Sequence, residues 1–169
     1  MLQLVEQLDK LDSTISTSDD EIVIEGFMDR YSVSYKEAVD ILRETKKFLT
    51  LAAESQDKGG ISLSIDQPLL IIDEMWHTFI LHTKQYVNFC LKTFNRFIHH
   101  KPTSKAEKEA IQQSLKENPS LIIEQTKEKM TQQYSLIYDK YGPDTLIKWY
   151  DEWATKYTPD YIDKIKKAS

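Results

Sequence analysis

All four histidines of this 169-residue chain lie in one segment, between Asp73 and Pro102. Asp73 and His77 are four residues apart, so on a helix they are neighbours on one face. A carboxylate beside an imidazole can bind a divalent metal ion, zinc above all, or can orient the imidazole for acid–base catalysis. We therefore predict a metal or ligand site at Asp73 and His77, and look for further residues that can reach it.

His99 and His100 can supply a third ligand if the chain folds back, because Pro102 disfavours helix at the residue before it and so places the pair on a turn or an extended loop. Adjacent side chains do not easily share a face, so we expect one imidazole to point inward and the other outward. His82 is five residues from His77. On a straight helix the two point roughly 140° apart, and we predict that His82 caps or packs.

The same residues also have a structural interpretation. Asp73 would then accept a hydrogen bond near a helix start, and His77 would be a partly buried polar residue beside Trp76. The spacing matches no specific zinc signature such as H-E-x-x-H, so both interpretations stay open. In the first, the protein binds a metal or a small ligand and could be a hydrolase with a metal-activated water. In the second, it is a non-catalytic protein-interaction module.

The middle of the chain is locally basic although the net charge is −5. No carboxylate occurs between Glu74 and Glu107, and the cations of this stretch are Lys84, Lys92, Arg96, Lys101 and Lys105. They could attract a small anionic ligand or an acidic protein partner, although no Gly-rich phosphate loop accompanies them. The overall acidity argues against nucleic acid. As further site residues we predict Trp76, Arg96 and Lys101.

Cysteine content and hydropathy indicate a cytoplasmic location. The single cysteine, Cys90, excludes an internal disulfide and lies on a predicted apolar stripe, so we expect a buried, inert thiol. Glu6 and Asp9 interrupt the apolar core that a secretory signal would need. The longest aliphatic run, residues 69–72, is far shorter than the roughly 20 residues that cross a bilayer. We predict no membrane segment.

The elements that must position the site are predicted to be helices. Apolar periodicity and few glycines favour an all-α fold, a single-domain orthogonal bundle of about six to seven helices over residues 1–169. Residues 1–18 should form a short helix and a linker. Capping boxes at Ser34 with Glu37 and at Ser104 with Glu107 should open helices, the first of which ends before Gly59.

The histidine segment itself is predicted to begin with a central core helix. It should run from Leu69 or Leu70 to about Thr93, after an extended connector over residues 61–66. Pro119 should begin a long amphipathic helix that Gly142-Pro143 stops. The last helix starts near Asp144, and a lysine-rich tail follows Pro159. The aromatic residues of that helix should pack in the core or, less favoured, anchor a partner: Trp149, Tyr150 and Trp153.

The chain resembles the small bacterial relatives of glycine-rich domain-containing proteins, a family described by a core of unknown function. IDEMWHTFILHTKQYVNFC resembles the family's Asp-x-x-Trp-His signature and its continuation, and FNRFIHHKP resembles its closing Phe-Ile-His-His-x-Pro. The likeness covers roughly residues 27–102, leaving 103–169 as C-terminal helices. Asn95 stands where a glycine is expected. The resemblance implies a shared centre and supplies no reaction; its residues are Asp73, Trp76, His77, His99, His100 and Pro102.

Overall fold

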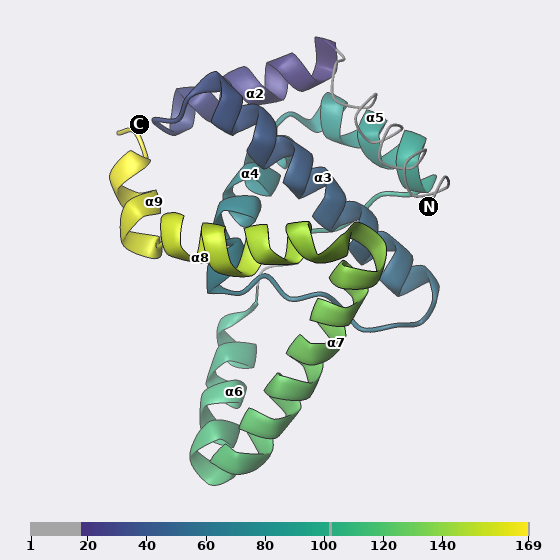
Figure 1. Cartoon of the computed structure of the whole chain (residues 1–169), viewed down its shortest axis with the longest axis vertical. Helices are drawn as coiled ribbons and strands as arrows, with labels where there is room; N and C mark the ends of the chain where they lie inside the picture. Colours follow the sequence, from purple (N-terminus) through teal and green to yellow (C-terminus); the bar gives the residue numbers. More distant parts are fainter. Residues whose placement is uncertain (1–17, 102, 169) are drawn as a thin grey trace.

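The computed structural model describes residues 18–101 and 103–168, and its fold is all-α, as predicted. The predicted N-terminal helix and linker lie outside the described residues except for Ser18. Figure 1 shows the elements in order: α2 (Ser18–Arg30), α3 (Tyr35–Asp57), the 3-10 turn η2 (Gln67–Leu69), α4 (Leu70–Leu81), α5 (Thr83–Phe94), α6 (Lys105–Glu117), α7 (Pro119–Ile147), the π-helical turn η3 (Lys148–Glu152), α8 (Trp153–Lys156) and α9 (Pro159–Ile165). Within the described ranges, no helix has both the length and the apolar character that crossing a membrane requires.

Both predicted capping boxes are present. The Ser34 hydroxyl accepts a hydrogen bond from the Glu37 amide at 3.2 Å, and the Glu37 carboxylate accepts one from the Ser34 amide. Ser104 and Glu107 form the same pair at the start of α6. Each box satisfies amides that the first helical turn leaves unpaired, so it fixes where the helix begins.

The core lies where α3 packs against α2, α4 and α5, with the C-terminal segment crossing it (Figure 1). Its largest fully buried side chains are aromatic and come from every one of these elements: Phe27, Tyr31, Phe48, Phe79, Tyr86 and Trp149. Trp149 is fully buried and Trp153 is 5% exposed. The C-terminal aromatic residues therefore contribute to the core, as the favoured prediction had it.

The prediction of one helix from Leu69 or Leu70 to about Thr93 was wrong, because the chain leaves the helical conformation at His82. His82 has φ −87° and ψ 65°, and its Nδ1 donates to the Thr78 carbonyl at 2.8 Å. Its ring packs so closely on α2 that a β-carbon at Gly26 would collide with it. Packing against α2 thus breaks the helix in two, and the break directs Tyr86 and Cys90 into the core. His82 packs, as expected.

The C-terminal third contains one predicted break and one unpredicted helix. Gly142, with φ 80° and ψ 178°, interrupts α7 where Gly142-Pro143 was predicted to stop it. Beyond it the chain turns to cross the molecule (Figure 1). The predicted tail after Pro159 is instead α9, which buries Ile162 and Ile165. Proline occupies the first turn of this helix, where its missing amide costs nothing.

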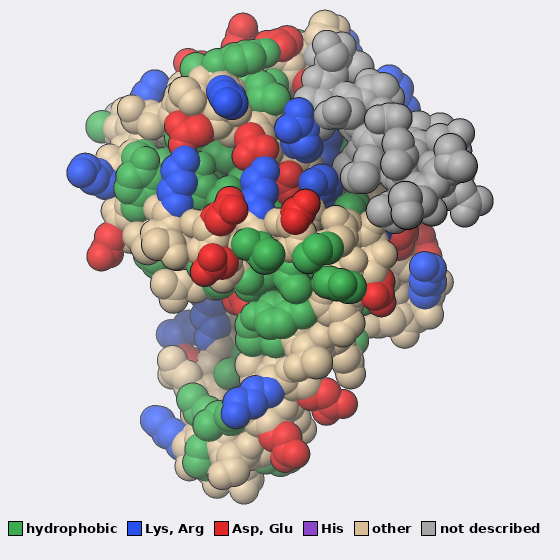
Figure 2. Space-filling model, in the orientation of Figure 1, with side chains coloured by type: hydrophobic (Ala, Val, Ile, Leu, Met, Phe, Trp, Pro, Cys, Tyr) green, Lys and Arg blue, Asp and Glu red, His purple; other side chains and the backbone are tan. Residues whose placement is uncertain are grey.

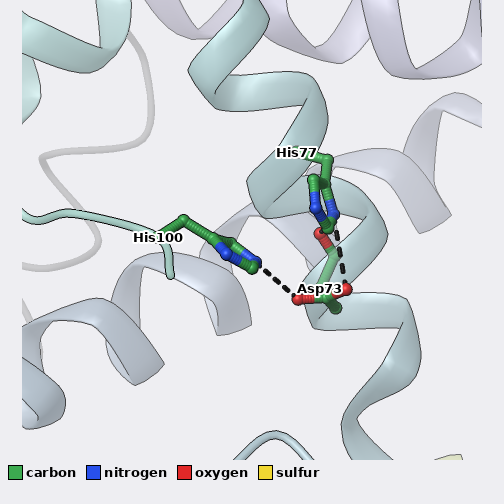
Figure 3. Close-up of side chains that lie close together, drawn as sticks. All are labelled: Asp73, His77 and His100. Atoms are coloured by element: carbon green, nitrogen blue, oxygen red, sulfur yellow. Dashed lines mark hydrogen bonds and ion pairs between the residues drawn. The ribbon is translucent and has the colours of Figure 1, made fainter. Parts of the chain in front are cut away.

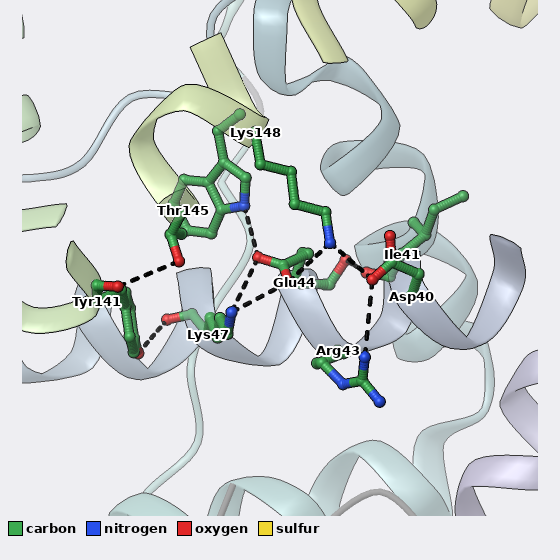
Figure 4. Close-up of polar contacts among 10 residues, drawn as sticks. Asp40, Ile41, Arg43, Glu44, Lys47, Tyr141, Thr145 and Lys148 are labelled. Carbon is green, nitrogen blue, oxygen red and sulfur yellow. Dashed lines mark hydrogen bonds and ion pairs between the residues drawn. The ribbon is translucent and has the colours of Figure 1, made fainter. Parts of the chain in front are cut away.

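A buried carboxylate ties α3 to the C-terminal segment (Figure 4). Glu44 on α3 is 1% exposed, and its carboxylate accepts hydrogen bonds from the Trp149 indole at 2.8 Å, from Lys47 at 3.1 Å and from Lys148 at 3.2 Å. Lys148 also pairs with Asp40 at 2.7 Å. Because a buried charge is tolerated only when it is paired, this network fixes how the last helices lie on α3.

Candidate metal centre

Asp73 lies between two imidazoles, His77 from its own helix and His100 from the loop after α5 (Figure 3). The two oxygens of its carboxylate serve different rings. Oδ1 is 2.8 Å from His100 Nε2, and Oδ2 is 3.3 Å from His77 Nδ1. One donor atom from each residue can be chosen so that all three lie within 4.8 Å of one another. The structure therefore brings together three of the four predicted metal ligands.

Helix α4 sets the geometry of Asp73 and His77. Its apolar face buries Ile72, Met75 and Phe79, which leaves Asp73 and His77 on the partly exposed side, one turn apart. His77 Nδ1 is 2.8 Å from the Asp73 backbone carbonyl. A carbonyl oxygen only accepts, so Nδ1 carries a proton, and in the neutral ring Nε2 has the lone pair that a metal ion would need. Metal-binding histidines are commonly held by such a second hydrogen bond.

Two buried side chains anchor the loop that carries His100. The Tyr86 hydroxyl donates to the Ile98 carbonyl at 2.6 Å and accepts from the Trp76 indole at 3.0 Å. The His100 ring then lies on the Trp76 ring, with 4.2 Å between centroids, and 4.5 Å from the His77 ring. Trp76, predicted as a site residue, thus forms one wall of the cluster. Tyr86 was missed, since only its place on an apolar stripe marked it in the sequence.

The turn before the loop begins at Asn95, where the family resemblance implied a glycine. Asn95 has φ 52° and ψ 23°, the left-handed conformation that glycine adopts freely, and its amide donates to the Leu91 carbonyl. Asparagine is the side chain that tolerates this conformation best after glycine. The departure from the family pattern therefore preserves the helix end.

The other predicted site residues have partners away from the cluster. His99 is exposed, and its ring lies on Phe97 at 4.9 Å, so His100 is the inward member of the pair. Arg96 donates to the Ala53 carbonyl at 3.1 Å and to the Asp57 carboxylate at 2.9 Å. Its guanidinium is therefore bound to the C-terminal end of α3. Lys101 pairs with Glu107 at 3.1 Å, where both are exposed.

Neighbouring groups are held in fixed protonation states by burial. Desolvation raises the pKa of the Cys90 thiol, so this cysteine is a poor nucleophile, as predicted. Burial, together with a hydrogen bond to Glu74, raises the pKa of the Tyr31 hydroxyl well above its ordinary range. Neither group adds an ionised side chain to the cluster at neutral pH.

The donor set fits a divalent metal ion. Zinc takes carboxylate oxygen and imidazole nitrogen, and catalytic zinc sites use three protein ligands and keep a fourth position for water or substrate. The side chains of Asp73, His77 and His100 are 25%, 43% and 13% exposed, so the cluster is held by the fold yet open to solvent at His77. His77 is therefore the member of the cluster that solvent reaches most easily.

Comparison with known proteins gives one family. A family model described as UCP032817-like matches residues 4–137, a span that includes all three residues of the cluster. No curated protein shows a significant match, and neither does any solved structure.

Proposed function

The chain belongs to the UCP032817-like family, a family of unknown function, and we propose that it binds a divalent metal ion, zinc most readily, through Asp73, His77 and His100. The observation that carries this proposal is the convergence of two imidazoles and a carboxylate from a helix and a distant loop. Three statements remain predictions from the sequence: kinship with glycine-rich domain-containing proteins, a bacterial source and a cytosolic location.

The chain's own residues would each have a distinct part. Asp73 holds both rings in place, His77 would bind the ion through Nε2 in its neutral form, and Trp76 covers one side of His100. A bound zinc ion would lower the pKa of a coordinated water to near neutrality and so supply a hydroxide nucleophile. Hydrolysis of a small anionic substrate is the finer function that we propose for this site.

Metal content is the direct test. Protein purified without an affinity tag and analysed for metals should contain about one zinc ion per chain. The His100→Ala and His77→Ala variants should lose it, and Asp73→Asn should bind zinc at least about tenfold more weakly. His99→Ala is the matched control, since it removes the neighbouring, exposed imidazole and should leave the zinc content unchanged.

The structural alternative makes a different prediction for the same variants. If the cluster only ties the loop to α4, His100→Ala should lower the free energy of unfolding by about 1–3 kcal/mol, whether or not zinc is added. Added zinc would then shift the melting temperature of neither the wild type nor the variant. That result, with no stoichiometric metal in the purified protein, would overturn the proposal.

A further inference from the structure

Aliphatic side chains are exposed where α2 meets α5 (Figure 1). The Asn88 side-chain amide on α5 donates to the Asp19 carboxylate on α2 at 3.3 Å. Ile22 lies one turn after Asp19 and is 44% exposed, and Leu91 lies one turn after Asn88 and is 53% exposed. Val87, one turn before Leu91, is 37% exposed. We call Ile22, Val87 and Leu91 the α2–α5 patch.

One flank of α2 faces α5 over two turns. Asp19, Ile22 and Gly26 follow one another at helical spacing, so their positions lie along the same flank. Gly26 at one end of it packs on the His82 ring, directly before α5, and Asp19 at the other end contacts Asn88. Ile22 lies between these two contacts, and the patch is therefore one surface shared by both helices.

Helix α5 gives the patch a positive border. It carries Lys84 and Lys92 and contains no carboxylate, and neither lysine has an ion pair within residues 18–101 and 103–168. The carboxylates in the first turn of α2 do not offset this charge, because each has a polar partner: Asp19 with Asn88 at 3.3 Å, Asp20 with Lys46 at 2.6 Å and Glu21 with Tyr35 at 2.5 Å. A segment that covers the patch should be aliphatic and acidic.

Residues 1–17, which lie outside the described residues, have this composition in the sequence. Their aliphatic residues recur at the spacing of one helical face, four and then three residues apart, and the charged residues between and after them are three carboxylates and one lysine. The aliphatic residues are Leu4, Leu8 and Leu11, and the charged ones are Glu6, Asp9, Lys10 and Asp12. The net charge of −2 is opposite to that of α5.

The chain's connectivity favours this segment over any separate partner. Helix α2 begins at Ser18, and the next residue, Asp19, already contacts α5, so the preceding residues start beside the patch. A short tether gives an effective concentration on the order of millimolar, which a second molecule seldom reaches. The family model also begins at residue 4, so the segment belongs to the family's span.

The exposed aliphatic side chains at the other end of the molecule lack these features. Figure 2 shows them on the projecting end formed by α6 and the start of α7, with lysines and carboxylates among them. Helix α6 carries three lysines and three glutamates, so its charge selects no acidic segment. This end also lies opposite α2, where residues 1–17 join the described chain (Figure 1).

We propose that residues 4–11 pack on the α2–α5 patch of their own chain through Leu4, Leu8 and Leu11. Their carboxylates then lie beside Lys84 and Lys92, and the junction of α2 with α5 is covered. The contact does not depend on the metal site. It makes the segment before α2 part of the folded domain.

Hydrogen exchange in the full chain tests the contact. Amides of residues 4–11 should exchange slowly in the wild type, and at the same rate over a wide range of protein concentrations, because the contact forms within one chain. Leu91→Glu and Leu8→Glu should each speed this exchange at least about tenfold, since a charge replaces one buried leucine. Ile147→Glu is the matched control. It places the same charge on a side chain that is 50% exposed and outside the patch, and should leave the exchange unchanged.

A spin label shows where the segment lies. Gln7 is off the stripe of leucines and Cys90 is buried, so Gln7→Cys supplies one accessible thiol for a nitroxide. The label should broaden the amide signals of α5 and leave those of α6 sharp. Fast exchange of residues 4–11 at every concentration would overturn the proposal. So would broadening that misses α5, or protection that rises with concentration, which would indicate a second copy on the patch.

Discussion

At the scale of single residues, Tyr86 decides where His100 lies. Its hydroxyl links the Trp76 indole to the carbonyl of Ile98, two residues before His100. Burial raises the pKa of this hydroxyl well above its ordinary range, so it stays protonated and can always donate. Tyr86 therefore acts on the cluster as a positioning residue, without touching it.

Tyr86→Phe should separate positioning from packing, because the ring stays and both hydrogen bonds are lost. We expect the free energy of unfolding to fall by about 1–3 kcal/mol, since two buried polar groups lose a partner. Zinc affinity should also fall about tenfold, as for other residues that orient metal ligands. Denaturant unfolding and a zinc titration measure the two effects. Tyr138→Phe, at a hydroxyl on a 54% exposed side chain, should change neither.

At the scale of elements, Glu37 does more than cap α3. Its carboxylate accepts hydrogen bonds from the Ser34 amide and from Lys156 at 2.6 Å, so it joins the start of α3 to the end of α8. The hydrogen bond from Lys156, followed by that from Ser34, lowers the pKa of Glu37. A lowered pKa means that the ionised form stabilises the folded state.

The stability that the ionised Glu37 carboxylate contributes is present above the ordinary pKa of a glutamate. It is lost as the pH falls through the lowered pKa of Glu37. We expect Glu37→Gln to destabilise the protein at neutral pH and to differ less from the wild type at about pH 3. Free energies of unfolding at the two pH values measure this difference. Glu109→Gln, at a carboxylate that is 63% exposed, should show no such pH dependence. Equal destabilisation at both pH values would contradict the assignment.

At the scale of the whole molecule, Glu44 holds the C-terminal segment on α3. Its carboxylate is the common acceptor for Trp149, Lys47 and Lys148. Removing one charged member of a buried ionic network leaves its partners without a counter-charge. The loss of folding free energy is then larger than the net contribution of the intact ion pair. Glu44 therefore helps to hold Trp149 in its buried position against α3.

Glu44→Gln should lower the free energy of unfolding by about 3 kcal/mol, the lower end of the range for a broken buried ion pair. The lower end applies because the side chains of Lys47 and Lys148 remain 14% and 25% exposed. Chemical denaturation gives the value. Asp57→Asn removes the ion pair with Arg96 at an aspartate that is 61% exposed, and it should cost less than about 1 kcal/mol. Similar losses in the two variants would contradict the role of Glu44.

The sequence by itself determined the features that depend on neighbours within one helical turn. Both capping boxes, the break at Gly142 and the pairing of Asp73 with His77 were predictable, because each involves residues at most four positions apart. The all-α class followed from periodicity that is equally local. The inward and outward directions of His99 and His100 were also expected, although not which of the two points inward.

Tertiary structure decided the rest, because it depends on contacts between segments far apart in the chain. His82 ends α4 because its ring packs on Gly26 of α2, which no local pattern reveals. His100 rather than His99 reaches Asp73 because Tyr86 holds the Ile98 carbonyl. A helix fixes the spacing of two ligands, and the packing of a distant loop is needed to deliver a third.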